Sequence, residues 1–210
     1  MTGGPLRILQ LEPLGGHPAL DFINTLDWRG RADAAEECLV SYQALLVWAS
    51  RGGLLEPREA KALDGAAAAE PEAAAEALAE AVALREALHR LVAAATAGGQ
   101  PATADLERLN HWLAATPATA RLVARPGGGY AWAEPRAGLG LSAPIIRIAH
   151  QAAELLASDR LGRVRCCAGP GCGWLFVDAS PNRGRRWCSM EGCGNRAKAK
   201  RHYRRATGRA

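Results

Sequence analysis

The chain has 210 residues, enough for one ordinary domain or for one domain with a small appendage. Hydrophobic residues make up 49% and charged residues 22%, fractions near the globular average that exclude a largely disordered or fibrous chain. The formal net charge is +5. Apolar runs are short and broken by charges, and the first residues lack the basic and apolar regions of a signal peptide, so we expect a cytoplasmic protein without a membrane span.

Residues 1–162 predict a helix-rich domain with a little antiparallel sheet. Residues 6–11 alternate weakly, which predicts a strand, and residues 19–26 fit either a buried strand or a short helix. Apolar spacing and capping residues predict helices from Ser41 to Gly52, briefly after Pro57, from Pro71 to Gly98, over 103–115, and from Ser142 to Leu156. Residues 121–134, folded about the glycines at 127–129, predict a β-hairpin.

The positive charge is concentrated at the end of the chain. Residues 163–210 contain ten Arg and two Lys against Asp178 and Glu191, which is +10, so the remaining residues carry −5. An acidic body with a basic tail is typical of a protein that binds a polyanion. The alternative is a tail whose charge only keeps the protein in solution.

The same tail contains five of the six cysteines, and four of them form two close pairs. Cys167 and Cys172 enclose four residues, as do Cys188 and Cys193, and fifteen residues separate the pairs. This spacing predicts four ligands for one structural Zn²⁺, because each pair forms a tight loop that directs two thiolates to one point. Cys166 is an alternative to Cys167 as the first ligand.

The region between and after the cysteine pairs predicts a small treble-clef-like zinc finger. Residues 173–177 fit a strand, 180–184 a turn, and 185–187 a return strand. A helix is then expected to begin near Cys188, with Ser189 as its cap, and to run through Arg205. The overall prediction is an α+β protein, with this finger over residues 163–210.

The terminal helix predicts a nucleic-acid-binding surface. At 100° per residue, its basic residues cover an arc of about 200°, and Ala199 and Tyr203 lie opposite, where they are expected to pack on the finger. Double-stranded DNA is the expected partner, because basic residues displace the counterions of phosphates. The candidate contacts are Arg185, Arg186, Arg196, Lys198, Lys200, Arg201, Arg204 and Arg205. RNA is the alternative if Trp174, Trp187 or Tyr203 stacks on unpaired bases, and exposed aromatic faces would favour it over duplex DNA.

The segment from His17 to Arg29 mixes apolar and polar residues, which allows two interpretations. Asp21, Asn24, Trp28 and Arg29 are candidates for a ligand pocket, since pockets combine apolar walls with a few directed polar groups. The favoured alternative is a core segment whose polar groups satisfy its own turns. His17 and Asp21, four residues apart, are more simply explained by structural hydrogen bonds than by a catalytic or metal site. No catalytic motif is present, so we do not expect an enzyme.

Two stretches of the chain resemble known families. Residues 172–178, 185–190 and 193–198, the last including the tetrapeptide Cys193-Gly194-Asn195-Arg196, resemble the CGNR zinc finger. Residues 16–29, GHPALDFINTLDWR, resemble the start of the ABATE domain, which is described as a stress-induced transcription regulator. The resemblance implies a bacterial transcription regulator whose finger binds DNA.

The sequence therefore predicts a zinc-dependent DNA-binding regulator. Its first 162 residues would sense a small-molecule effector, form a homodimer, or do both. A homodimer is expected because a single small finger makes few base contacts. The alternative is an enzyme or small-molecule-binding protein in which the finger is structural and the basic tail is an anchor.

Overall fold

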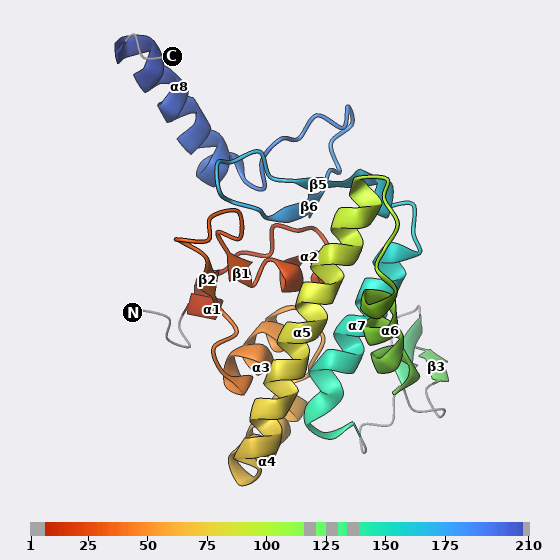
Figure 1. Cartoon of the computed structure of the whole chain (residues 1–210). Helices are drawn as coiled ribbons and strands as arrows, with labels where there is room; N and C mark the ends of the chain where they lie inside the picture. The colour runs from red at the N-terminus through yellow and green to blue at the C-terminus, as the bar shows by residue number, and fades with distance from the viewer. Residues whose placement is uncertain (1–6, 116–120, 125–129, 134–138, 208–210) are drawn as a thin grey trace.

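A long central helix organises the body of the protein. The computed structural model describes residues 7–115, 121–124, 130–133 and 139–207. Helix α5 (Pro71–Thr96) contacts most of the other helices (Figure 1). These are α2 (Pro18–Ile23), α3 (Tyr42–Arg51), α4 (Pro57–Ala69), α6 (Thr103–Ala114) and α7 (Ala143–Leu156). The predicted helix-rich α+β class is confirmed.

The buried face of α5 explains its central place. This face carries small residues in the first half of the helix and large ones in the second, all at helical spacing and all buried. They are Ala74, Ala77 and Ala81, followed by Leu84, Leu88 and Leu91. The small alanines allow neighbouring helices to approach closely, whereas the leucines fill the wider part of the core. Arg85 is also buried on α5, and its guanidinium forms two 2.6 Å hydrogen bonds with the carboxylate of Glu37.

Most of the predicted helices form where their caps indicated. The Ser41 side chain accepts a hydrogen bond from the Ala44 amide and starts α3, which ends at Gly52. Pro57 and Pro71 occupy the first turns of α4 and α5, where a missing amide hydrogen costs nothing. Helix α4 has 13 residues and is therefore longer than the short helix predicted there.

The first segment differs from its prediction. The strand expected over residues 6–11 is wrong, because Arg7–Gln10 form a short helix, α1, that packs against α3. Its amphipathic pattern buries Ile8, and the Arg7 side chain forms salt bridges with Asp27 and Glu36. The ambiguous segment 19–26 is mainly helical: α2 begins after His17, whose ring accepts a hydrogen bond from the Ala19 amide.

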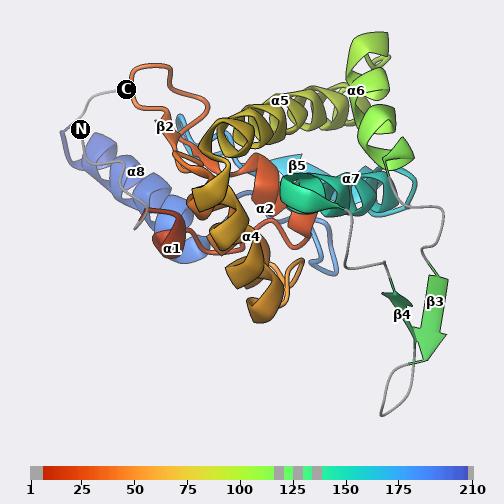
Figure 2. The same ribbon diagram turned by 90° about the horizontal axis from the view of Figure 1, so that it is seen from below.

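The described residues form three small antiparallel sheets. Strand β1 (Leu26–Asp27) pairs with β2 (Glu36–Glu37), and β3 (Arg121–Ala124) pairs with β4 (Tyr130–Ala133). The second pair is the predicted hairpin, which projects from the helices (Figure 2). Its glycine turn and Glu134 lie outside the described residues.

The third sheet begins the C-terminal part of the chain and corrects one prediction. A 3₁₀ turn, η2 (Leu161–Arg163), leads into β5 (Val164–Cys166), which pairs with β6 (Leu175–Val177). The return strand expected over residues 185–187 is wrong, because β5 already occupies the place beside β6. Residues 185–187 instead bend back to the first cysteine loop, where the Ala168 amide donates to the Arg186 carbonyl.

The final helix starts later than predicted. Ser189 is a cap, as predicted, but it caps a π-helical turn, η3 (Met190–Gly194). The Ser189 hydroxyl accepts a hydrogen bond from the Gly192 amide. Helix α8 (Asn195–Thr207) then begins after the second cysteine pair and projects away from the body (Figure 1).

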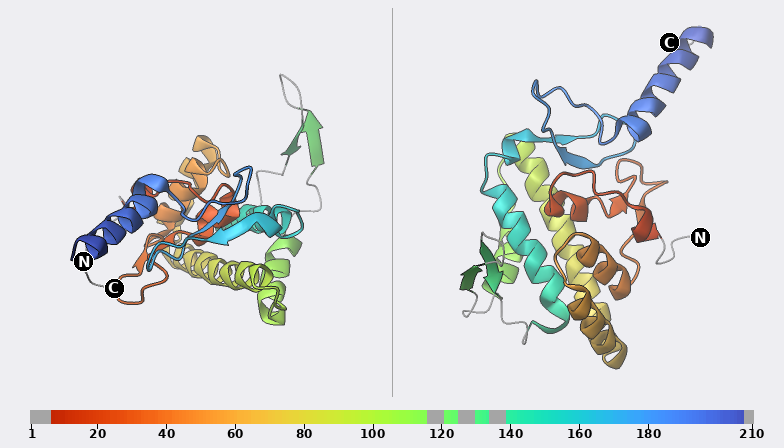
Figure 3. Two further views of the ribbon diagram at one scale, coloured as in Figure 1. Left: turned by 90° about the horizontal axis from the view of Figure 1, so that it is seen from above. Right: turned by 180° about the vertical axis from the view of Figure 1, so that it is seen from behind.

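The C-terminal part is joined to the body through α2 and the segments on either side of it. The Asn24 side chain donates to the Leu175 carbonyl and accepts from the Leu175 amide, at 2.9 Å in both cases. The Val177 amide donates to the Gly15 carbonyl, and the Trp174 ring donates to Asp27. Val164, Leu175 and Val177 belong to the main apolar core, so β5 and β6 complete the body (Figure 3).

Asn24→Ala should therefore destabilise the whole protein. It leaves the amide and carbonyl of Leu175 without partners at a buried position, and each such loss costs about 1–3 kcal/mol. We expect a free energy of unfolding lower by about 2–5 kcal/mol, measured by urea denaturation. Asn110→Ala, on the exposed face of α6, is the control. Equal stability of the two variants would contradict the importance of this joint.

Candidate metal centre and nucleic-acid interface

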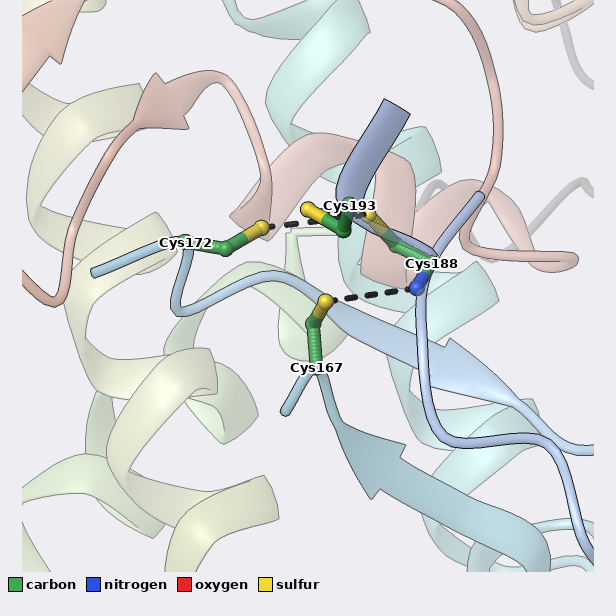
Figure 4. A group of neighbouring side chains, drawn as sticks. All are labelled: Cys167, Cys172, Cys188 and Cys193. Carbon is green, nitrogen blue, oxygen red and sulfur yellow. Dashed lines mark hydrogen bonds between the residues drawn. The ribbon is translucent and has the colours of Figure 1, made fainter. Parts of the chain in front are cut away.

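Four cysteine side chains meet beside β5 and β6. The sulfur atoms of Cys167, Cys172, Cys188 and Cys193 all lie within 4.8 Å of one another and are buried. Cys167 and Cys172 lie in the loop that joins β5 to β6, Cys188 precedes η3, and Cys193 lies within it. Figure 4 shows the four side chains directed toward a common point.

The distances within this cluster fit a tetrahedral zinc ion. Zn–S bonds of about 2.3 Å at tetrahedral angles place neighbouring sulfurs about 3.8 Å apart. The Sγ atoms of Cys172 and Cys188 are 3.8 Å apart, and those of Cys188 and Cys193 are 3.7 Å apart. Four cysteine ligands in a buried position leave no open coordination site, which is the arrangement of a structural rather than a catalytic zinc. The described residues thus form one structural zinc site.

The electrostatics of the cluster also favour a cation. Hydrogen bonds from the Cys172 and Cys188 thiols lower the pKa of Cys167, and the same hydrogen bonds to Cys167 raise the pKa values of Cys172 and Cys188. Cys172 and Cys188 therefore keep their protons when no cation is present, because further thiolates this close to Cys167 would repel one another. A zinc ion releases those protons and neutralises the thiolates.

Backbone and side-chain donors orient two of the sulfurs. The Cys167 sulfur accepts from the amides of Gly169 and Cys188, at 3.4 and 3.3 Å. The Cys193 sulfur accepts from the Arg196 guanidinium at 3.0 Å. Cys166 is exposed and lies outside the cluster, so the sequence alternative between Cys166 and Cys167 resolves in favour of Cys167.

Glycines around the first cysteine loop were missed by the sequence analysis. A Cβ atom on Gly169 would lie 2.8 Å from the Cys193 sulfur. Gly171 and Gly173 have φ values of +74° and +71°, which favour glycine, and both lie against the loop at residues 29–31 of the body. The three glycines alternate with other residues from 169 to 173, a pattern that could have been noticed as a sign of close backbone approach.

The two tryptophans beside the cysteines contribute to the core of the finger. Trp174 is buried and donates its ring N–H to the Asp27 carboxylate at 2.8 Å. Trp187 is half-buried against the cysteine cluster. Asn195 is exposed at the start of α8.

Two of the arginines predicted to bind nucleic acid make contacts inside the protein. Arg185 is half-buried over the Phe176 ring and donates to the carbonyls of Leu14, Trp187 and Cys188. Arg185 is therefore removed from the exposed basic surface, because these contacts hold its guanidinium against the finger.

Arg196 connects the metal centre to the body. Besides its hydrogen bond to Cys193, its guanidinium lies 5.0 Å from the centre of the Trp28 ring, a cation–π contact. Trp28 has a φ of 52°, a left-handed conformation that a bulky residue adopts only at a cost of about 1–3 kcal/mol. The first turn of α8 is thus fixed both to a zinc ligand and to the segment after α2.

Beyond this first turn, α8 is an exposed basic helix. Every side chain from Lys198 to Arg204 is exposed, including Lys200 and Arg201. The expected packing of Ala199 and Tyr203 against the finger is wrong: both are exposed, Tyr203 to 62%, because the helix points away from the finger instead of lying on it. Arg186 is exposed above the Trp187 ring, and the side chain of Arg205 lies outside the described part.

The four residues considered for a ligand pocket do not surround one cavity. Asp21 and Asn24 line a cavity of about 300 Å³ between α2 and α3. Trp28 contacts Arg196, and Arg29 forms a salt bridge with Glu86 of α5. His17 and Asp21 each accept a hydrogen bond from a backbone amide, of Ala19 and Gly15 respectively. Much of this segment therefore holds the finger and α5 in place.

Two family models match the chain. Residues 16–159 match ABATE, described as "Putative stress-induced transcription regulator", and residues 163–206 match the CGNR zinc finger. None of the curated proteins compared with the chain matches it. No helix in the described part of the chain is both long and apolar enough to cross a bilayer.

Gly169→Ala should weaken zinc binding. The added methyl group would lie 2.8 Å from the Cys193 sulfur and 3.0 Å from its Cβ atom, so a ligand must move. We expect roughly tenfold lower zinc affinity, the size of effect seen when the surroundings of a metal ligand are disturbed. Competition with a chromogenic chelator measures it. Gly162→Ala, whose Cβ would meet no atom within 4 Å, should bind zinc like the natural protein, and equal affinity of both variants would contradict the argument.

Asp21→Asn should stabilise the protein at neutral pH. Burial raises the pKa of Asp21 from its ordinary 3.8 to about 6, against a lowering by the Gly15 hydrogen bond. Ionisation therefore opposes folding, and stability is lost as the pH rises through about 4 to 6. We expect a gain on the order of 2 kcal/mol for Asp21→Asn at pH 8, which disappears toward pH 4.

Urea denaturation between pH 4 and pH 8 measures this gain. Glu76→Gln, on the exposed face of α5, is the control, and its effect should stay small throughout this range. A gain for Asp21→Asn that does not change with pH would show that the charge of Asp21 is not its cause.

Proposed function

This chain belongs to the ABATE family, and we propose that it is a zinc-dependent DNA-binding protein that regulates transcription. Residues 163–210 would bind zinc and DNA, and residues 1–162 would supply sensing, dimerisation or both. The two matched families are regulatory and zinc finger types rather than enzymatic families, and we propose a regulator rather than an enzyme. A role in a stress response is suggested by the family description.

The observation that carries this proposal is the exposed basic helix α8. Its 13 residues, about 20 Å of helix, include six basic residues and no acidic one. Neighbouring turns place like charges four residues apart, as with Lys200 and Arg204, which destabilises an isolated helix. DNA phosphates would relieve this repulsion, and a helix of this kind fits the major groove.

The metal centre gives this helix a fixed starting point. Cys193 is a member of the cysteine cluster and lies two residues before α8, and Arg196 contacts both its sulfur and Trp28. Zinc binding would therefore set the direction in which the basic side chains project. Trp174 is buried and Trp187 is half-buried, so base stacking by these two rings is disfavoured, which supports duplex DNA. The exposed ring of Tyr203 is the feature that supports the RNA alternative.

A homodimer and a cytoplasmic location complete the proposal. One short helix reaches few base pairs, so two fingers on paired half-sites would be needed for specific binding. Reduced cysteines and a chromosomal partner both fit the cytoplasm. Sedimentation with and without DNA tests the dimer, and a monomer in both conditions would contradict it.

Neutralising α8 should weaken DNA binding and reduce its dependence on salt. We expect the variant with Lys198, Lys200, Arg201 and Arg204 all changed to Gln to lose up to four phosphate contacts. Each lost contact should flatten the slope of log K against log salt by about 0.9. Fluorescence anisotropy with a labelled duplex at several salt concentrations measures the slope. The control changes Arg58 and Lys61, exposed on α4, to Gln and should bind like the natural protein.

The duplex for this measurement comes from a selection on a random DNA pool at two salt concentrations. A recovered motif, lost on Cys188→Ser, is the result expected for a sequence-specific regulator. Enrichment of no sequence, with affinity that collapses as salt rises, would contradict the regulator and leave a general polyanion-binding tail. Tighter binding to single-stranded RNA than to any duplex would favour the RNA alternative.

A further inference from the structure

A cavity of about 300 Å³ lies between the segment before α2, α2 itself and α3. This volume is at the lower end of those that hold small organic ligands. Its walls combine apolar side chains with a few polar ones. The lining residues that matter here are Leu11, Pro13, Pro18 and Trp48 on the apolar side, and Glu12 and Asp21 on the polar side.

Asp21 differs from the other half-buried carboxylates of the body. Five of those form salt bridges with arginines: Asp27 with Arg7, Glu37 with Arg85, Glu59 with Arg147, Glu86 with Arg29 and Asp105 with Arg90. Asp21 forms no salt bridge within the described part of the chain, and its one hydrogen bond comes from the Gly15 amide, at 2.7 Å. Its carboxylate thus lines the cavity without a salt-bridge partner among the described residues.

The other charged groups of the cavity do not supply that partner. Arg51 lines the cavity, but its guanidinium donates to the carbonyls of Ile8 and Leu11. Glu12 adds a second negative charge at the exposed edge. Burial raises the pKa of Asp21 to about 6, so the carboxylate is still charged at neutral pH and its charge opposes folding. A ligand with an ammonium group would compensate this charge, whereas an anion would be repelled by both carboxylates.

The cavity is also connected to the finger by two sets of hydrogen bonds. The Gly15 amide donates to Asp21, and the Gly15 carbonyl accepts from the Val177 amide of β6. Asn24, which lines the cavity, makes both of its amide contacts with Leu175 of β6. Strand β6 follows the loop that carries Cys167 and Cys172. A ligand that displaces Gly15 or Asn24 therefore acts directly on the strand that supports the metal centre.

We propose that this cavity binds a small organic cation, with Asp21 as the partner of its ammonium group and with Trp48 and the prolines around its apolar part. Binding of this ligand would shift β6 and thereby alter the finger. The second half of this proposal rests on the proposed DNA-binding function, and the first half does not. The site would be the effector site of the regulator.

Benzylamine is a suitable probe because it combines an ammonium group with one apolar ring. Isothermal titration at pH 7.5 should detect its binding to the zinc-loaded full chain. Benzyl alcohol, which has nearly the same shape without the charge, and benzoate, which is an anion, should bind at least about tenfold more weakly. Equal binding of benzylamine and benzyl alcohol would overturn the assignment of a cation site.

Asp21→Asn tests the residue that carries the site. Asparagine keeps the shape and an oxygen that can accept from Gly15, so we expect a folded protein with benzylamine affinity reduced about tenfold or more, as for the loss of a charged hydrogen bond. Glu76→Gln should leave the affinity unchanged. If Asp21→Asn fails to fold, Trp48→Leu, which changes the apolar wall, replaces it and should also lower the affinity. Unchanged affinity in a folded variant would overturn the site.

The coupling is measured separately from DNA binding. The NMR chemical shifts of the Leu175 and Val177 backbone amides should change in proportion to the fraction of protein that has bound benzylamine. The affinity for DNA should change at least about threefold when benzylamine is saturating. Shifts confined to α2 and α3, or unchanged DNA affinity in a protein that binds both ligands, would overturn the coupling. If the protein binds no DNA, the titration and the shifts still decide the cation site, so its failure and that of the proposed function remain distinguishable.

Discussion

The pairing of the Asn24 side chain with the Leu175 backbone is the contact on which the rest of the structure depends. A carboxamide has one donor group and one acceptor group in the plane of an amide, so it binds the edge of a strand as a neighbouring strand would. Asn24 thereby attaches β6 to α2 without a third strand. The cysteine loop, the apolar contacts of Val164 and Val177, and the direction of α8 all follow from the position of β6.

Local sequence patterns predicted the features that are local in space. Cysteine spacing identified the four clustered thiols, since each pair lies within one loop, and caps such as Ser41 and Gly52 located α3. The partner of β6 was not predictable in this way. Residues 185–187 follow a turn sequence, which predicts a return strand, but the place beside β6 is taken by β5, and only the assembled chain shows this competition.

The functions of polar residues near residue 24 were the least predictable part of the site. Asn24 and Trp28 were candidates for a ligand pocket because they are polar or aromatic in an apolar context. Asn24 does line a cavity, but the contacts that fix both side chains are with Leu175 and Arg196, which lie far away in the chain. Likewise, Arg185 and Arg196 are indistinguishable from their neighbours in a basic tail. Their carbonyl, thiolate and aromatic partners are what separate them from Lys200 and Arg201, which project from α8.

The shared core has a consequence for how such proteins diverge. A finger that buried its own hydrophobic residues would be an independent domain and could be exchanged between chains. Here Val164, Leu175 and Val177 are covered by the body, and the loop at residues 29–31 lies against Gly171 and Gly173. Residues 15–30 and residues 163–177 must therefore change together, so in related chains we expect these two segments to be inherited as one unit, while α8 remains free to acquire new target sequences.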